Sequence, residues 1–196
     1  LHMGLEPGQA CPTIYDVLTD SVPLEQAVHP AALDRLSVVP STIDLAAAEV
    51  ELVGVVGREV ILRDAVAAMD ALHESPPYDY VLIDCPPSLG VLTLNGLTAA
   101  HGVIVPVQAE YYALEGLSAL LATVKQIRDH RNPRLEMEGI VRTMHDPRNN
   151  LANQVSTQLV THFTDEVYRT IIPRNVRLAE APSHGLPVLQ YDIKSR

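Results

Sequence analysis

The sequence contains no run of about 20 apolar residues, the length that a helix needs to cross a bilayer. Residues 1–12 are mixed in character and rich in glycine and proline, which is not the pattern of a secretory signal. Cysteine is scarce, and its two occurrences, Cys11 and Cys85, lie far apart in the chain. We interpret both as reduced thiols of a cytosolic protein, with a disulfide as the less favoured alternative.

Positive charge is also scarce over most of the chain. The formal net charge is −10; residues 1–127 carry 4 Lys and Arg against 16 Asp and Glu, whereas residues 128–196 carry 10 against 8. The overall acidity argues against nucleic acid as a partner. The C-terminal third is the exception, since its arginines can form a local basic face; the alternative is that they are ordinary solvated side chains.

Several motifs of common catalytic sites are missing. The eight histidines show no metal-binding spacing such as H-E-x-x-H, and Ser88 is not part of a G-x-S-x-G turn. His184 lies in the turn APSHG, where a structural role is expected. The phosphate-binding loop G-x-x-x-x-G-K-[ST] is also absent, and Gly54–Gly57 does not replace it because no Gly-Lys-Ser/Thr follows.

The 196 residues, 47% of them hydrophobic, suffice for one folded domain with a substantial core. Predicted strands and helices alternate, and several strands are apolar on both faces, which is typical of a parallel sheet. We therefore predict an α/β fold, a mostly parallel sheet flanked by helices, as a single domain over residues 1–196. The predicted strands are 36–39, 80–83, 102–107, 138–144, 167–172 and 188–190. The predicted helices are 13–18, 23–28, 41–56, 59–74, 92–100, 113–129 and 150–163.

The segment YDYVLIDCPPS at 78–88 carries the clearest functional signal. Its apolar run 80–83 favours a strand and ends at Asp84, and two prolines follow that no strand or helix interior tolerates. A carboxylate at the tip of a buried parallel strand faces the crevice where open α/β sheets bind ligands. This is the form of a Walker B strand, whose Asp helps to hold Mg²⁺. The alternative is an Asp that caps a helix or turn.

Four long motifs occur in one order: YDYVLIDCPPSLG at 78–90, PVQAEYYALEG at 106–116, GIVRTMHDPRNNL at 139–151 and IPRNVRLAEAPSHGLPVLQY at 172–191. With TIYDVL at 13–18 and STIDLAAAEVELV at 41–53, they make nearly the whole chain similar to the ParA/Soj partition ATPases, relatives of the MinD group of deviant-Walker proteins. The resemblance implies a P-loop NTPase fold. Family members carry a Lys-rich P-loop before this region and a final helix after it, so the chain resembles a core truncated at both ends.

The resemblance also implies nucleotide-binding residues, with ATP and Mg²⁺ as cofactors. Asp84 is the implied catalytic residue, and it orders Mg²⁺ through water between the β and γ phosphates. Thr143 and the turn Pro173, Arg174 and Asn175 correspond to the adenine-binding side. An Asn amide can read a purine edge, and Pro gives a rigid apolar face. The alternative is that Pro-Arg-Asn is simply a turn that ends a strand.

Arg148 and Arg177 match positions at which Soj-like proteins carry arginines that touch DNA. Two arginines per subunit imply modest, strongly salt-dependent and sequence-independent binding; ordinary surface arginines are the alternative. The segment 108–116, with Tyr111 and Tyr112, corresponds to the region near the face of a nucleotide-sandwich homodimer. The paired tyrosines are equally compatible with a half-buried core.

The implied function is DNA segregation in the cytoplasm, on the nucleoid and without a membrane. ATP closes a dimer that coats nonspecific DNA, and a ParB-type partner stimulates hydrolysis. Without a phosphate loop, however, we predict that this chain binds ATP·Mg²⁺ very weakly, does not hydrolyse it, and self-associates through exposed strand edges. A non-enzymatic truncated homologue that only binds partners is therefore the second hypothesis. A MinD-like membrane role would need a C-terminal amphipathic helix that the sequence does not show.

Overall fold

The computed structural model describes residues 12–31, 33–110 and 113–192. The chain forms two compact units. Unit 1 comprises the residues up to Ala99 together with the segment from Val176 onward, and unit 2 runs from Ala100 to Asn175. The organisation of residues 1–196 as a single domain stays a prediction.

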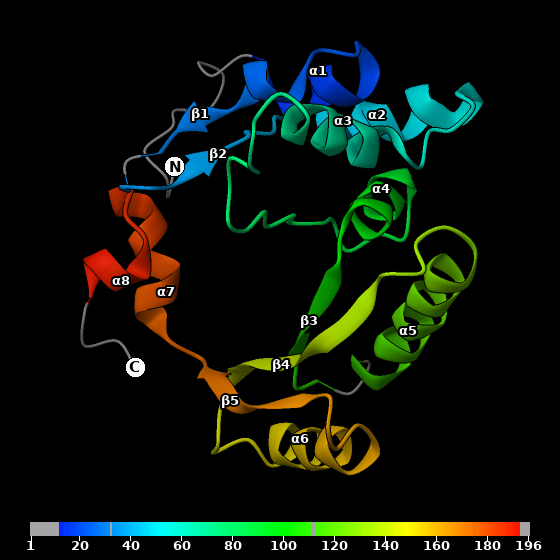
Figure 1. Cartoon of the computed structure of the whole chain (residues 1–196). Helices are drawn as coiled ribbons and strands as arrows, with labels where there is room; N and C mark the ends of the chain where they lie inside the picture. The colour runs from blue at the N-terminus through cyan, green and yellow to red at the C-terminus, as the bar shows by residue number, and fades with distance from the viewer. Residues whose placement is uncertain (1–11, 32, 111–112, 193–196) are drawn as a thin grey trace. The chain divides into compact units, whose positions relative to one another are not determined.

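Unit 2 contains a three-stranded parallel sheet in the order β3–β4–β5. Its strands are β3 (Gly102–Gln108), β4 (Glu136–His145) and β5 (Val167–Pro173). Helix α5 (Ala113–His130) connects β3 to β4, and α6 (Asn150–His162) connects β4 to β5 (Figure 1). All five elements were predicted from the sequence, and the α/β class with a parallel sheet flanked by helices is confirmed.

Both crossover helices pack on one apolar core. Leu117 of α5 and Leu159 of α6 share this core with Ile140 of β4, and all three are buried. Val105 and Val107 join them from β3, on alternate positions of the strand. Burying a side chain of this size contributes roughly 1.5–3 kcal/mol, so the contacts of α5 and α6 fix the positions of the strand ends.

A bulge interrupts β4 near its start. Val103 is opposite Met137 but Ile104 is opposite Gly139, so β4 contains one extra residue at this point. Gly139 has φ +152, and a Cβ atom there would collide with the ring of Tyr168 and with the carbonyl of Glu166. Only glycine tolerates this backbone conformation and this close approach.

Unit 1 is mainly helical. Helix α1 starts at a Thr13 cap whose backbone N–H and hydroxyl both donate to Asp16 Oδ2, at 2.6 and 2.8 Å. These bonds lower the pKa of Asp16 and hold the first turn of the helix. The elements of unit 1 are α1 (Ile14–Thr19), η1 (Leu24–Ala27), β1 (His29–Pro30), β2 (Ser37–Val38), α2 (Leu45–Glu51), η2 (Leu52–Gly54), α3 (Ile61–Asp70), α4 (Val91–Ala99), α7 (Val176–Glu180), η3 (Ala181–His184) and α8 (Val188–Tyr191).

Helices α3 and α4 are joined by one buried amide. Asn95 Oδ1 accepts from the backbone N–H of Leu62 at 3.0 Å, and Asn95 Nδ2 donates to the carbonyls of Arg58 and Val91 at 2.7 and 2.9 Å. A buried polar group needs such partners. The contact therefore fixes α4, and with it the loop that begins at Asp84.

Two strand predictions are wrong. The segment Tyr80–Ile83 is extended but forms no strand, because no strand of the described residues pairs with it, and Tyr80 and Leu82 are 87% and 91% exposed. The segment predicted as a strand at Val188–Gln190 is helix α8, which begins after Pro187. A run of three residues becomes a strand only where a neighbouring strand pairs with it, and none of the described strands pairs with this segment.

Candidate functional site

The carboxyl ends of the three parallel strands lie at one edge of the sheet in unit 2. Gln108 at the end of β3 is opposite Thr143 of β4, and His145 at the end of β4 is opposite Pro173 of β5. The backbone N–H of Arg174 donates to the carbonyl of His145 at 3.0 Å. The structure thus brings together the predicted residues Thr143, Pro173, Arg174 and Asn175 at the edge where open α/β sheets bind ligands.

These residues are accessible to a ligand. Thr143 and Asn175 are half-buried, while Pro173 and Arg174 are exposed. Met144, which follows Thr143, has φ +53, a left-handed conformation that residues with side chains seldom adopt. The register of β4 and β5 also shifts between Arg142 and His145, so Met144 lies in an irregular part of β4.

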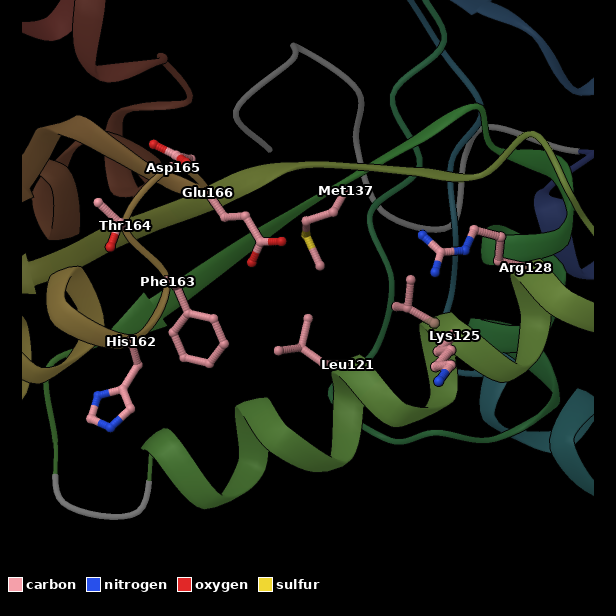
Figure 2. Close-up of a pocket in the computed structure, with 10 residues that line it drawn as sticks. Leu121, Lys125, Arg128, Met137, His162, Phe163, Thr164, Asp165 and Glu166 are labelled. Atoms are coloured by element: carbon pink, nitrogen blue, oxygen red, sulfur yellow. The ribbon is translucent and has the colours of Figure 1, made fainter.

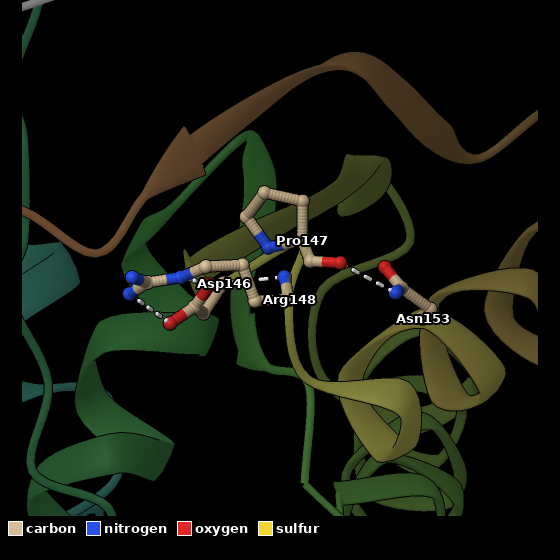
Figure 3. Close-up of polar contacts among 4 residues, drawn as sticks. All are labelled: Asp146, Pro147, Arg148 and Asn153. Atoms are coloured by element: carbon tan, nitrogen blue, oxygen red, sulfur yellow. Dashed lines mark hydrogen bonds and ion pairs between the residues drawn. The ribbon is translucent and has the colours of Figure 1, made fainter.

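The loop after β4 holds Arg148 against Asp146 (Figure 3). Asp146 Oδ1 accepts from the backbone N–H and from Nε of Arg148, both at 3.0 Å. Asp146 Oδ2 accepts from Nη2 of Arg148 at 2.9 Å. The pair is a two-pronged guanidinium–carboxylate contact, which fixes the plane of the guanidinium as well as its position.

This pair defines the electrostatics of the carboxyl edge. The hydrogen bonds from the Arg148 side chain and backbone, helped by the charge of Arg174, lower the pKa of Asp146 from 3.8 to about 2. Asp146 is therefore ionised at neutral pH, and it raises the pKa of Arg148 in turn. We did not predict Asp146 or His145 as site residues. An Asp before Pro-Arg at the end of a strand favours a turn closed by its carboxylate, and this signal was available in the sequence.

Two asparagines support the same loop. Asn149 caps α6 by accepting from the backbone N–H groups of Leu151 and Ala152 at 3.0 and 3.4 Å. Asn153 Nδ2 donates to the carbonyl of Pro147 at 2.8 Å (Figure 3). The loop therefore keeps Arg148 next to the strand ends while the guanidinium itself stays exposed.

Arg177 lies in unit 1, on α7, and is also paired with carboxylates. Its Nη1 is 2.8 Å from Glu180 Oε2, and its Nε is 3.7 Å from Asp192 Oδ2. The Glu180 contact raises the pKa of Arg177. His184 stacks on Tyr191 in the same segment, with ring centroids 4.7 Å apart, which is a structural contact.

Asp84 lies in unit 1 and is exposed. Within the described residues its carboxylate takes part in no hydrogen bond or ion pair. The following loop is fixed to α4 by Thr93, whose hydroxyl contacts the carbonyls of Pro86 and Ser88 at 3.2 and 2.5 Å. Partial burial and the nearby charge of Asp84 raise the pKa of Cys85, so its thiol is protonated at neutral pH.

One exposed carboxylate fits a metal held through water and does not fit a direct metal cage. In the described part of the chain, no three His, Cys, Asp or Glu residues come together as metal ligands. Tyr111 and Tyr112, predicted near a dimer face, lie outside the described residues. None of the described helices combines the length and apolar character of a membrane-spanning segment.

A cavity of about 560 Å³ lies at the opposite edge of the unit 2 sheet, beside the start of β4. Figure 2 shows Leu121, Met137 and Phe163 pointing into it, with the carboxylate of Glu166 at its centre. The lining residues are Leu121, Val124, Lys125, Arg128, Met137, His162, Phe163, Thr164, Asp165 and Glu166. None of the predicted site residues is among them, so this cavity is separate from the carboxyl edge.

Comparison with known proteins places these features in a family. A family model described as an AAA domain matches residues 1–137. The chain is 48% identical over 194 residues to the sporulation initiation inhibitor protein Soj of Bacillus subtilis, a match that covers 99% of this chain and 75% of that protein. It is 49% identical to the chromosome partitioning protein ParA of Myxococcus xanthus, over 99% of this chain and 67% of that protein.

Solved structures agree on the fold. A cobyrinic acid a,c-diamide synthase from Mycobacterium smegmatis, solved with bound ADP and magnesium, is 33% identical with a TM-score of 0.74, over 94% of this chain and 79% of that chain. The cell division ATPase MinD of Pyrococcus furiosus, 17% identical over 96% of this chain and 71% of that chain, has the same fold with a TM-score of 0.74. The described fold is thus that of the MinD and ParA P-loop ATPases, and the chain belongs to the ParA/Soj family of chromosome partitioning ATPases.

Proposed function

We propose that this chain contributes the base-recognition edge and the Mg²⁺ carboxylate of a ParA/Soj-type partition ATPase. One observation carries the proposal: the register of β3, β4 and β5 brings Thr143 and the Pro173–Asn175 turn to the same carboxyl edge. Amide and hydroxyl groups there can read the polar edge of a purine, and Pro173 offers an apolar surface for its ring.

Asp84 is the proposed Mg²⁺ residue. Mg²⁺ keeps several of its waters and binds few carboxylates directly, which suits one exposed carboxylate on a loop anchored by Thr93. When bound, the ion neutralises the charge that develops on the transferred phosphoryl group. Asp84 supplies the negative charge that keeps the ion in place.

We further propose that Arg148 and Arg177 contact the phosphates of nonspecific DNA in a homodimer on the nucleoid, with a ParB-type protein as the stimulating partner. Both arginine side chains are exposed by more than half, so a phosphate group could reach them. The similarity to chromosome partitioning proteins supports the partner class.

The nucleotide assignment is tested with a phosphate-loop chimera, in which the preceding N-terminal segment of the Bacillus subtilis relative is joined to Leu1. Asn175→Leu in this chimera removes the amide and should weaken ATP binding by about 10-fold to 100-fold, because the base loses a hydrogen-bond partner. Isothermal titration calorimetry measures the change. The matched control is Asn150→Leu, an exposed change at the start of α6 that should leave affinity intact.

Equal ATP affinity of the Asn175→Leu chimera and its parent would show that this edge does not recognise the base. The 196-residue chain without the added segment is the second arm. Since the backbone N–H groups and the lysine of a phosphate loop provide most of the attraction for the phosphates, we expect no micromolar ATP site on it. Micromolar binding by this chain would contradict the role given to the loop.

A further inference from the structure

Arg142 of β4 is a buried cation that is bound by neutral groups. The residue is only 8% exposed, and it forms no ion pair with the carboxylates of the described residues. Its Nη1 donates to the hydroxyl of Ser156 on α6 at 2.9 Å. Its Nη2 donates to the backbone carbonyls of Tyr168 and Arg169 on β5, at 3.0 and 3.4 Å. Burying a charge without a counter-ion is costly, so a position that only fills the core would favour an aliphatic residue.

The two carbonyls belong to an irregular stretch of β5. Ile140 of β4 is opposite Val167 of β5. Arg142 comes two residues later on β4, but it is opposite Ile171, which comes four residues later on β5. Two residues of β5 are therefore in excess of the ladder, and backbone groups in such a bulge lose their strand partners. Because backbone carbonyls away from water need a donor, the guanidinium of Arg142 replaces the missing backbone of β4.

The two strands come into register again just beyond this contact. His145 of β4 is opposite Pro173 of β5, and the carbonyl of His145 accepts from the backbone N–H of Arg174 at 3.0 Å. Since β5 has surplus length before this point, the position at which it meets the end of β4 depends on how the bulge is held. The contacts of Arg142 with the bulge thus precede the carboxyl edge directly.

We propose that Arg142 is a positioning residue for the base-recognition edge. Its guanidinium holds the bulge of β5 in one register and thereby places the turn Pro173–Asn175 beside Thr143. This inference rests on the function proposed above for that edge, in which Thr143 and the turn recognise the base. Arg142 itself is buried against α6 and acts through the position of the turn.

Hydrogen exchange of two amides tests this tie without a nucleotide. In the phosphate-loop chimera, Arg142→Met keeps an unbranched side chain but removes its donors. The amide of Arg174, beyond the bulge, should then exchange at least about tenfold faster, because the turn opens more often. The amide of Ile140 donates to the carbonyl of Glu166 at 2.7 Å before the bulge, and its exchange should change by less than about twofold. NMR measures both rates, and unchanged exchange at Arg174 would overturn the proposal.

A variant of Ser156 separates the tie to β5 from general packing. Ser156→Ala removes one partner of the guanidinium but leaves its contacts with the two carbonyls, so the exchange of Arg174 should stay within about twofold of the parent. Acceleration as large as that of Arg142→Met would mean that loosened packing is the cause, which overturns the proposal. If Arg142→Met does not fold, Arg142→Gln replaces it, since its shorter amide cannot hold both carbonyls.

Two probes connect the tie to nucleotide binding. Arg142→Met should weaken binding of ATP by about tenfold, because the turn that contacts the base is misplaced. Binding of inorganic tripolyphosphate should stay within about twofold, because the added phosphate loop holds the phosphates. Isothermal titration calorimetry with Mg²⁺ measures both affinities. An equal loss for the two probes would indicate general damage to the site and would count against a positioning role.

Failure of this inference can be told apart from failure of the proposed function. If Asn175→Leu weakens ATP binding while Arg142→Met changes neither ATP affinity nor the exchange of Arg174, the edge recognises the base without Arg142, and only this inference fails. If Asn175→Leu has no effect on ATP affinity, the base-recognition role fails, and the positioning role of Arg142 fails with it.

Discussion

At the scale of single residues, Asp146 is the side chain that most directly shapes the candidate site. Its carboxylate accepts hydrogen bonds from both the backbone and the side chain of Arg148, and the positive charge of Arg174 helps to lower its pKa. Its position follows from the end of β4 and from the Asx-type turn after it. The arginine was predictable from the family motif, but its carboxylate partner became evident only when the geometry of the turn was known.

The first prediction concerns acid stability. Because the folded-state pKa of Asp146 is about 2 and lies below its ordinary value of 3.8, ionised Asp146 stabilises the folded chain. This contribution is complete above pH 3.8 and is lost as the pH falls to about 2. Asp146→Asn should therefore flatten the decline of the urea midpoint over this window.

Arg148→Ala should flatten the same decline, since Arg148 is the main cause of the lowered pKa, and the double variant should add little to either single change. Asp165→Asn, at an exposed position of the α6–β5 connection, is the control and should keep the parental slope. If the urea midpoint of the Asp146→Asn variant falls with pH as steeply as that of the parent, the Asp146–Arg148 pair does not contribute to folding stability.

The second prediction concerns the two arginines. In the phosphate-loop chimera with ATP, Arg148→Glu with Arg177→Glu should weaken binding to a nonspecific duplex and reduce the salt slope by about 0.9 for each phosphate that is no longer neutralised. Anisotropy titrations over a range of salt concentrations measure both. Arg134→Glu with Arg169→Glu changes the charge equally at two other exposed positions and should have a smaller effect. If both double variants weaken DNA binding equally, the binding depends on the net charge of the chain and not on Arg148 and Arg177 in particular.

At the scale of elements, helix α4 depends on groups that the sequence did not reveal. Asn95 is 1% exposed and satisfies three backbone groups of α3, α4 and the turn before α3. An Asn in the middle of an apolar helix looks like a weak helix former from sequence alone. Two of its partners come from more than 30 residues away, and no local pattern contains that information.

The third prediction follows from this amide. Asn95→Ala leaves the N–H of Leu62 and the carbonyl of Arg58 without partners in a buried place, so it should lower the free energy of unfolding by roughly 2–4 kcal/mol. Urea denaturation measures the decrease. Asn153→Ala removes one bond in a less buried loop and should cost about 1 kcal/mol or less. A decrease at Asn95 no larger than at Asn153 would contradict the role of the buried amide.

The same scale shows which elements were predictable. Strands β3, β4 and β5 and helices α5 and α6 have long, regular apolar patterns, and all five were found. The run at Tyr80–Ile83 has an equally strong strand composition, yet it is not a strand, because a strand also needs a neighbour for its backbone hydrogen bonds. Composition reports the preference of a segment, whereas pairing depends on the rest of the fold.

At the scale of the whole molecule, the described residues leave apolar strand-forming backbone exposed. The side chains of Tyr80 and Leu82 are largely exposed, and β3 and β5 each pair with β4 alone within the described residues. Unpaired edges and extended apolar segments pair readily with other chains. The self-association predicted from the sequence thus has a specific candidate segment.

The fourth prediction tests this segment. Tyr80→Lys with Leu82→Lys places charge on the extended run and should lower the association of the 196-residue chain, because charged side chains oppose pairing at strand edges. Light scattering over a concentration series measures the change. Leu72→Lys, at an exposed position after α3, is the control and should associate like the parent. A parent chain that stays monomeric at high concentration would contradict the prediction itself.

The bulge at Gly139 has a consequence for how the family sequence can vary. Met137 and Ile140 both contact the core of unit 2 although they are three residues apart, which simple alternation along a strand forbids. The extra residue thus decides which side of β4 each later side chain occupies. Deleting it would exchange the inward and outward positions of Arg142 and Thr143. We therefore expect evolution to have preserved the length of this segment more strictly than most of its side chains.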